Sequence, residues 1–463
     1  MAHRAARVLA CNWTGRATVP SRSLYPHQWS WDSAFVAIGL RHRSPLRAQR
    51  ELETLLDAQW DDGRVPHIVF HPAVPRDAYF PSPDFWRSTA AGRASGAPAD
   101  RETSGIVQPP VHALAAWLVH RAHPALGRSR RFLDRLYPKL AAWHGYLSTR
   151  RDAGGHGLAA IVHPWESGMD NSPCWDTPLA RVAPAPSGSF RRADLDHGRA
   201  ADRPTDLDYG RYVRLAADYR DAGYDDARAR PAFAVEDPGF NSLLAASEHA
   251  LAQIAHTLGD ETAAAAHLRR ARELTGALTR RLWDAQAGQF LARDLLADGV
   301  DGALVPGRSA AGLLPLAVPG LPGAVADVLA RTAASAHFTR PAGTGLVASY
   351  DLLGDAFDPH CYWRGPAWCN VNWLLERGLR QHGHTVRADA LRSALLAAAD
   401  ATECAEYVDP ATGQGRGARD FSWTAALTLD LLAAQAAGAV GAAGAGQPPE
   451  VSSSASEVTA ARA

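Results

Sequence analysis

The sequence has few of the features that mark secreted, membrane or nucleic-acid-binding proteins. Its five cysteines are scattered over 463 residues without a CxxC pair, a pattern typical of reduced thiols rather than of a disulfide framework or a zinc site. Lys plus Arg and Asp plus Glu number 48 each, so no excess of charge predicts a nucleic-acid or membrane partner. No apolar run approaches the roughly 20 residues that span a bilayer.

The N-terminal segment, residues 1–12, is too short and too interrupted by His and Arg to resemble a signal peptide. Together these absences predict a cytoplasmic protein whose partner is a small molecule. The sequence has no HExxH, P-loop or Gly-x-Ser-x-Gly motif, which disfavours zinc proteases, NTPases and α/β-hydrolases. The glycine-rich run 413–417 has no preceding strand, so a plain turn is favoured over a dinucleotide loop.

Apolar residues recur at helical spacing along most of the chain. Leu52, Leu55 and Leu56, for example, fall on one face at i, i+3 and i+4. Similar patterns predict helices over residues 111–120, 130–147, 209–219, 241–258, 260–283, 322–334, 368–379, 386–399 and 422–436. Strand signals are few, and one is the β-branched run 64–70. About ten to twelve helices of similar length predict a toroid or solenoid of helix pairs, although no fixed repeat is visible.

Two long irregular stretches interrupt these helices, residues 72–106 and 178–205. Loops of that length in a folded protein are usually lids, binding loops or disordered segments. Beyond residue 436 the sequence is mostly Ala, Gly and Ser, which predicts a disordered tail over 437–463. The remaining residues, 1–436, are predicted to form a single domain.

Two acidic segments, far apart in the sequence, carry the clearest chemical signal. Trp165–Pro173 (WESGMDNSP) combines Glu166 and Asp170 with Gly, Asn, Ser and Pro, which favour a loop over a helix or strand. The second segment, Glu403–Pro410, places Glu406 beside a tyrosine. A general acid needs a raised pKa, which apolar surroundings or a second carboxylate supply. Most acidic residues are surface charges, but two such loops fit an enzyme that cleaves a glycosidic bond with paired carboxylates.

Two further segments combine aromatic rings with hydrogen-bonding side chains. Tyr25–Phe35 (YPHQWSWDSAF) fits a hexose subsite and, equally well, a capped helix start with core tryptophans. For His360–Trp368 (HCYWRGPAW) we favour sugar binding over a structural turn in which Arg364 pairs with a carboxylate. His67 and His71 are separated by an apolar run that reads as extended chain. A hydroxyl-binding or core histidine is therefore favoured over a metal ligand.

Taken together, the segments Tyr25–Phe35, Trp165–Pro173, Tyr362–Trp368 and Glu406–Trp423 resemble glycoside hydrolase family 63. Within that family the chain is most similar to bacterial glucosylglycerate hydrolases, and next to mannosylglycerate hydrolases. The resemblance implies an all-α fold, an (α/α)6 barrel, with long loops over the active-site mouth where the loops of the inner helices meet. It also implies an inverting mechanism that needs no cofactor or metal.

The resemblance assigns roles to individual residues. Asp170 matches the general acid and Glu406 the general base, with Glu166 as a neighbour that binds sugar or tunes Asp170. Arg203 and Tyr209 match positions at the glycerate end, where a guanidinium would pair with the carboxylate. The predicted substrate-binding residues are Tyr25, Gln28, Trp31, Asp32, His67, Tyr79, Gln108, Trp165, Glu166, Arg203, Tyr209, Tyr362, Trp363, Arg364 and Trp368.

The predicted function is hydrolysis of the α-glycosidic bond of glucosylglycerate to glucose and glycerate. Mannosylglycerate stays open as the substrate, because the two hexoses differ only at the 2-hydroxyl. Three further functions compete with this prediction: an α-glucosidase acting on a neutral oligosaccharide, a sugar epimerase on the same barrel, and a carbohydrate-binding protein. The carboxylate loops disfavour the last two, since epimerases typically use histidine pairs and a binding protein needs no paired acids. Self-association into a homo-oligomer is also left open.

Overall fold

Two concentric rings of helices form the framework of the protein. The computed structural model describes residues 1–196, 199–340 and 342–444 of the chain. In this part, inner and outer helices alternate along the sequence as an (α/α)6 barrel, which confirms the predicted all-α fold. The inner helices are α2 (Ser30–Leu40), α6 (His112–Ala122), α11 (Pro238–Thr257), the 3-10 helix η7 (Ala310–Ala317), α14 (Cys369–Gln381) and α16 (Ser422–Gly444). The outer helices are α1 (Ala2–Cys11), α3 (Pro45–Leu56), α8 (Phe132–Arg150), α12 (Glu261–Leu282), α13 (Gly323–Ala333) and α15 (Thr385–Ala401).

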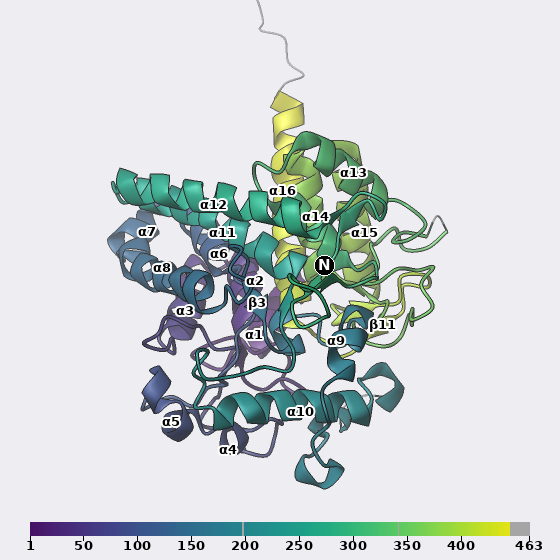
Figure 1. The fold of residues 1–463 in the computed structure, drawn as a ribbon. Coiled ribbons are helices and arrows are strands. Elements are labelled where there is room, and N and C mark those ends of the chain that lie inside the picture. The colour runs from purple at the N-terminus through teal and green to yellow at the C-terminus, as the bar shows by residue number, and fades with distance from the viewer. Residues whose placement is uncertain (197–198, 341, 445–463) are drawn as a thin grey trace, which may run out of the picture.

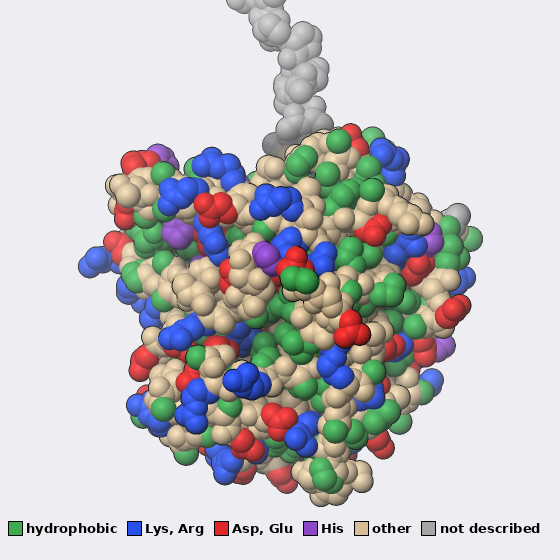
Figure 2. All heavy atoms as spheres, viewed as in Figure 1, with side chains coloured by type: hydrophobic (Ala, Val, Ile, Leu, Met, Phe, Trp, Pro, Cys, Tyr) green, Lys and Arg blue, Asp and Glu red, His purple; other side chains and the backbone are tan. Residues whose placement is uncertain are grey.

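The inner ring is closed because each inner helix contacts the next and α16 packs against α2. Every residue of α2 is buried, as expected for a helix surrounded by others. The outer helix α12 instead buries one face, at Ala271, Leu274 and Leu278, and exposes charged residues on the other. Figure 2 shows acidic and basic side chains interspersed over one face of the molecule, in line with their equal numbers. The hydrophobic core therefore lies within and between the two rings.

Local sequence sets where several barrel helices begin. Asp237 caps α11, since its Oδ1 accepts a hydrogen bond from the amide of Phe240 at 2.6 Å and Pro238 occupies the first turn. Asp260 caps α12 through the amide of Ala263 at 2.9 Å, as its position after a glycine predicts. Such caps satisfy amides that no preceding helical turn can reach.

Two-residue strands join the loops at the mouth of the barrel. β1 (Gln28–Trp29) pairs with β2 (Ile68–Val69), which lies in the run predicted to be extended. β9 (Ala367–Trp368) pairs with β10 (Tyr407–Val408), and β10 with β11 (Gly415–Arg416). β1 and β9 run directly into α2 and α14, so these ladders tie the start of two inner helices to neighbouring loops. The remaining strands are β3 (Ala160–Ile161), β4 (Val235–Glu236), β5 (Trp283–Asp284), β6 (Gln289–Phe290), β7 (Arg293–Asp294) and β8 (Ala303–Leu304).

The two irregular stretches and α10 (Asp206–Asp221) form a layer at one end of the barrel. α4 (Pro83–Trp86) and α5 (Ser88–Ala91) pack against α10, and the three lie together at the bottom of Figure 1. Other short helices are η1 (Arg93–Ser95), α7 (Pro124–Ser129), η2 (Pro164–Ser167), η3 (Pro173–Trp175), α9 (Asp176–Ala180), η4 (Ser187–Ser189), η5 (Ala193–Leu195) and η6 (Ala200–Asp202). The long loops therefore cover the mouth of the barrel, as the fold class predicts.

The structure adds helices that the sequence pattern did not predict. α1 was missed, and so was η7, whose internal Pro315 interrupts the helical periodicity. α16 continues to Gly444, past the predicted domain end at residue 436, because its alanine-rich sequence favours helix. The rest of the predicted tail, residues 445–463, lies outside the described residues, so its disorder stays a prediction. None of the described helices combines the length and apolarity needed to cross a bilayer.

Candidate active site

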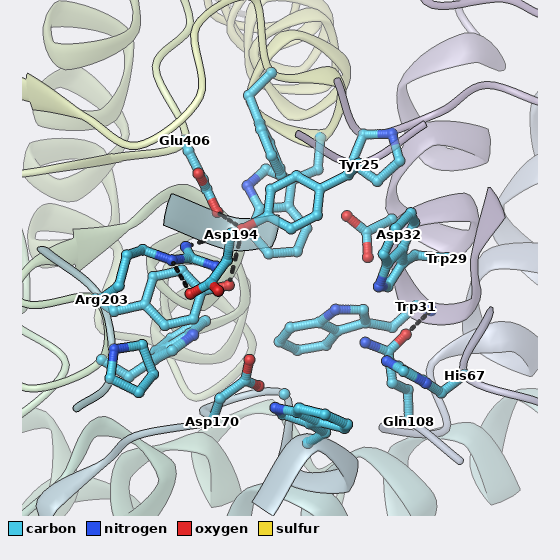
Figure 3. A pocket seen from close by; sticks show the side chains of 18 of the residues that line it. Tyr25, Trp29, Trp31, Asp32, His67, Gln108, Asp170, Asp194, Arg203 and Glu406 are labelled. Carbon is cyan, nitrogen blue, oxygen red and sulfur yellow. Dashed lines mark hydrogen bonds and ion pairs between the residues drawn. The ribbon is translucent and has the colours of Figure 1, made fainter. Parts of the chain in front are cut away.

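One pocket at the mouth of the barrel gathers most of the residues predicted to bind or react (Figure 3). Both predicted catalytic residues, Asp170 and Glu406, line it. The predicted binding residues that line it are Tyr25, Trp31, Asp32, His67, Tyr79, Gln108, Trp165, Arg203, Tyr209, Tyr362 and Trp363. They come from the barrel loops, from the start of α2 and from the overlying layer, so the folded chain brings distant segments to one site.

The loop that carries Asp170 depends on a glycine. Gly168 ends η2 with a φ of +71°, a left-handed conformation that glycine adopts without strain. A Cβ at this position would lie 2.5 Å from the ring of Trp31, so glycine lets the loop pack directly on that indole. The hydroxyl of Tyr212 donates to the backbone carbonyl of Asp170 at 3.1 Å. These contacts fix the loop at the pocket wall.

Glu406 precedes β10 and lies on the opposite side of the pocket from Asp170 (Figure 3). Its Oε1 accepts a hydrogen bond from the hydroxyl of Tyr25 at 3.0 Å, and its Oε2 accepts one from the amide of Ala418 at 2.8 Å. The turn before Ala418 passes so close that a Cβ on Gly417 would lie 2.3 Å from Oε2. Both carboxylate oxygens are therefore held in place, and the side chain is 1% exposed.

The two carboxyl groups have surroundings that favour different protonation states. Burial raises the pKa of Asp170 to about 7, and the nearby Arg203 only partly opposes this shift. Burial also raises the pKa of Glu406, but Arg203, the Ala418 amide and the Tyr25 hydroxyl all favour its charged form. Asp170 is therefore suited to hold a proton near neutral pH, and Glu406 is suited to accept one.

Arg203 is the only Lys or Arg among the described residues that line the pocket. Its Nη1 donates to the hydroxyl of Tyr25 at 3.1 Å, and its Nε donates to Asp194 at 3.4 Å. The guanidinium lies 4.3 Å from the centre of the Tyr362 ring. Its Nη2 makes no hydrogen bond within the described chain, so one arm of the planar fork remains for an anionic ligand.

Aromatic and neutral polar groups form most of the remaining wall. Trp363 lies 6.4 Å from Trp31, measured between ring centres. The side-chain oxygen of Gln108 accepts from the amide of Trp31 at 3.2 Å, which leaves its NH₂ group to donate elsewhere. Burial lowers the pKa of His67 to about 3, so its imidazole is neutral at physiological pH. Rings together with neutral donors and acceptors suit a hexose, which has apolar faces and a rim of hydroxyls.

Three predicted binding residues lie behind the pocket wall instead of lining it. The amide of Gln28 donates to the backbone and the carboxylate of Glu51, so it belongs to a buried network under the start of α2. Trp368 stacks at 3.8 Å on the back of an indole that lines the pocket. Arg364 forms an ion pair with Asp176 at 2.7 Å. None of the three lines the cavity, and the sequence motif does not show which of its side chains would.

Glu166 is the fourth predicted binding residue outside the pocket, and it is fully buried. Both its oxygens accept from Arg151 at 2.8 Å. They also accept from the backbone amides of Val107 at 3.2 Å and Val162 at 2.8 Å. One carboxylate thereby joins the end of α8, the loop before α6 and the segment that leads to the Asp170 loop. Glu166 supports the site without contacting its interior.

Replacing Glu166 by Gln is expected to destabilise the protein, because it leaves the buried guanidinium of Arg151 short of a counter-charge. Removing one partner of a buried ion pair costs about 3–5 kcal/mol, and we expect the lower end because Asp226 still lies 3.1 Å from Arg151. Urea unfolding followed by tryptophan fluorescence measures the change. An Asp389→Asn control removes an exposed partner of Arg380 and should leave the unfolding midpoint unchanged. Equal midpoints for both variants would contradict a supporting role for Glu166.

The pocket also contains residues that the sequence did not single out for binding. They are Pro20, Trp29, Gly168, Asp194, Pro204, Phe421 and Trp423. Trp29 and Trp423 lie inside two of the family motifs, so their aromatic character was a usable signal. Asp194 lies in an irregular stretch among other charged residues, and nothing in the sequence distinguishes it from them. Its position at the pocket follows from ion pairs with Arg192 at 2.8 Å and Arg203 at 3.4 Å, which only the fold reveals.

The arrangement defines what chemistry the pocket can support. Two carboxyl groups line it from opposite sides, and one guanidinium lies over the ring of Tyr362. Across the described ranges, no group of three or more His, Cys, Asp or Glu side chains is positioned to hold a metal ion. Paired carboxyl groups on opposite sides of a cavity can protonate a leaving group and activate a water molecule.

Comparison with known proteins identifies a family with this architecture. Residues 25–424 match the family described as the mannosylglycerate hydrolase MGH1-like glycoside hydrolase domain. Over 436 residues the chain is 44% identical to the mannosylglycerate hydrolase of Rubrobacter radiotolerans, covering 93% of this chain and 96% of that protein. It is 38% identical over 442 residues to the glucosylglycerate hydrolase of Mycolicibacterium hassiacum, covering 93% and 97%.

A solved structure agrees in fold as well as in sequence. The GH63 mannosylglycerate hydrolase from Thermus thermophilus, crystallised in complex with Tris and D-glycerate, superposes with a TM-score of 0.82. The two sequences are 39% identical, and the match covers 93% of this chain and 99% of that one.

Proposed function

The chain belongs to the mannosylglycerate hydrolase MGH1-like glycoside hydrolases of family 63, and from this premise we propose that it hydrolyses the α-glycosidic bond between a hexose and glycerate. The observation that carries the proposal is the pair Asp170 and Glu406, which reach one pocket from opposite sides with Arg203 beside them. The names of the relatives and the glycerate complex of the Thermus thermophilus structure support the same substrate class.

In the proposed reaction Asp170 is the general acid and Glu406 the general base. Glu406 takes a proton from a water molecule as that water attacks the anomeric carbon. Asp170 gives its proton to the glycosidic oxygen, which leaves as the free hydroxyl of glycerate. The bond breaks through an oxocarbenium-like transition state, and attack from the face opposite the leaving group inverts the anomeric centre. Each proton transfer contributes about 10²- to 10⁴-fold to the rate.

The leaving group itself carries a negative charge that the pocket must accommodate. Arg203 is the cation available among the described lining residues, and it holds the glycerate carboxylate in this proposal. A planar guanidinium also orients the carboxylate, because it can donate two parallel hydrogen bonds. The aromatic wall around Trp31 and Trp363 then holds the hexose.

Two hexoses compete for this site. The sequence motifs resemble those of glucosylglycerate hydrolases most, so glucosylglycerate is the first candidate substrate. The 44% identity to a mannosylglycerate hydrolase supports mannosylglycerate as the second. Glucose and mannose differ only in the orientation of the 2-hydroxyl, so the same carboxyl pair serves both. A cytoplasmic enzyme with one catalytic domain, predicted over residues 1–436 and extended by α16 to Gly444, completes the proposal.

Hydrolysis of four substrates by the wild-type enzyme tests the proposal. We expect cleavage of α-glucosylglycerate or α-mannosylglycerate at rates far above those for trehalose and maltose, which lack a carboxylate. Proton NMR of the first turnovers should show the β anomer of the hexose, since inversion of an α-glycoside produces it. Cleavage of the neutral disaccharides as fast as the glycerate substrates would contradict the proposal that the substrate is a hexose linked to glycerate. An α anomer as the first product would contradict the inverting mechanism.

The pH dependence of kcat/KM is expected to be bell-shaped, with the alkaline limb set by Asp170. A general acid works only when protonated, so activity should fall as the pH rises through about 7, the pKa of Asp170. The acidic limb reports protonation of Glu406. Because the pKa of Glu406 is raised, this limb lies at a higher pH than for an ordinary glutamate, and the pH optimum is narrower. Initial rates from about pH 4 to about pH 9 at constant ionic strength measure the profile. A rate that keeps rising above neutral pH would contradict this role for Asp170.

A further inference from the structure

A second cavity lies beside the active site and shares one residue with it. Its volume is about 240 Å³, and its wall includes Arg199, Arg203, Arg416 and Arg419. Arg203 lines both cavities. Asp202 is the only Asp or Glu among the described residues of this wall, and it pairs with Arg416 at 3.1 Å. Arg203 pairs with Asp194, which lies outside this wall, at 3.4 Å. Of these four arginines, the proposed hydrolysis uses only Arg203.

The cavity wall also contains buried hydrogen-bond donors without acceptors. The side chain of Arg416 is 9% exposed, and its Nη1 donates to Asp202 at 3.1 Å and its Nη2 to Gln414 at 3.2 Å. Its Nε is buried and has no partner within the described residues. The hydroxyl of Tyr407, which lines the same cavity, is likewise buried and unpaired there. Buried donors rarely stay unsatisfied, so a ligand with several acceptor oxygens would complete both.

From the cavity, its charges and its unpaired donors, we propose that it binds a phosphate group. A phosphate offers several strong acceptor oxygens and matches the planar fork of arginine. The volume is large enough for inorganic phosphate or for a phosphate carried on a three-carbon acid. Arg199 and Arg419 are exposed residues of this wall, whereas the side chains of Arg203 and Arg416 are only 10% and 9% exposed.

The bound phosphate would act on the neighbouring active site through two shared elements. Arg203 would interact with the phosphate as well as with the carboxylate of the substrate, because it lines both cavities. The segment that carries Arg416 and Arg419 also contains Ala418, whose amide donates to Glu406 at 2.8 Å. Phosphate is therefore expected to weaken the binding of carboxylate-bearing substrates. This consequence for catalysis rests on the proposed function, whereas the binding itself does not.

Phosphorus-31 NMR titration tests the binding directly and needs no activity. We expect the signals of inorganic phosphate and of 3-phosphoglycerate to broaden or shift on addition of the wild-type protein. The double variant R199Q/R419Q changes only exposed residues and should raise the dissociation constant at least about tenfold. Arg50→Gln serves as the matched control, because Arg50 is an exposed arginine on α3 that does not line this cavity.

The measured affinities distinguish the two sources of phosphate and test whether this cavity is the site of binding. Tighter binding of 3-phosphoglycerate would identify the ester as the ligand, and equal affinities would identify free phosphate. Equal dissociation constants for the wild type and the double variant would overturn the proposal. Unchanged signals at about 20 mM ligand, a concentration that detects even weak sites, would overturn it as well.

A kinetic experiment then checks the coupling. At constant ionic strength, phosphate should raise the KM for a glycerate-linked substrate in the wild type and leave kcat unchanged. R199Q/R419Q should lose this response and keep the activity of the wild type without phosphate, because neither arginine lines the catalytic pocket. Inhibition that persists in the double variant would place the phosphate in the catalytic pocket and overturn the coupling. If no glycerate-linked substrate is cleaved, the NMR titration still decides the binding.

Discussion

The Asp170→Asn enzyme is expected to lose about 10²- to 10⁴-fold in kcat on a glycerate-linked substrate, yet to retain most activity on the matching α-hexosyl fluoride. Fluoride departs without a proton, so a substrate that carries it does not need the general acid. The glycerate oxygen is a poor leaving group and does need one. Initial rates on both substrates, at one mildly acidic pH, measure the contrast.

The Glu406→Gln enzyme should instead lose activity on both substrates, because each requires an activated water molecule. The pair of variants thus separates the two roles, which geometry alone does not. Asp176→Asn is a suitable control, since Asp176 is half exposed and pairs with Arg364 outside the pocket wall. If Glu406→Gln kept its activity on the fluoride and Asp170→Asn lost it, the acid and base assignments would be reversed.

Replacing Arg203 by Gln is expected to lower kcat/KM on the glycerate-linked substrate about 10- to 100-fold more than on the same hexose linked to glycerol. A hydrogen bond to a charged group contributes about 1.5–3 kcal/mol, and only glycerate carries that charge. Both substrates should lose some activity, because Arg203 also contacts the Tyr25 hydroxyl that donates to Glu406. The ratio of the two losses is therefore the quantity to measure.

Arg364→Gln provides the matched control for Arg203. This arginine was also predicted to bind substrate, but it pairs with Asp176 behind the wall. Its replacement should leave the ratio between glycerate and glycerol substrates unchanged. Equal losses on both substrates in Arg203→Gln would remove Arg203 from the aglycone subsite and direct attention to the other polar residues of the pocket.

Sequence reasoning reached the loops of the proposed acid and base because their composition has a direct physical meaning. The Gly, Asn, Ser and Pro residues around Asp170 exclude a regular helix, and the structure places that loop at the pocket. Helical spacing likewise located most of the barrel helices, since an amphipathic helix must bury one face. These features are local, so they can be read without the fold.

The direction of individual side chains could not be read in the same way. Glu166 and Asp170 lie close together in one loop, but one binds Arg151 in the core and the other faces the pocket. Trp363 and Trp368 likewise lie in front of and behind one wall. Asp194 enters the site through ion pairs with residues of its own irregular stretch. Such outcomes depend on tertiary contacts that composition and spacing do not contain.

The closed inner ring has a consequence for how the protein is made. The side chain of Asn12, near the start of the chain, donates to the hydroxyl of Ser422 at 2.9 Å, and α16 packs on α2. Contacts between segments so far apart in sequence form late, because a very long chain segment must be closed first. The ribosome therefore synthesises Tyr25 long before Trp423, although both residues line the same pocket. The pocket stays incomplete until the last helix has emerged from the ribosome. Appearance of hydrolytic activity during translation would time the closure of the ring.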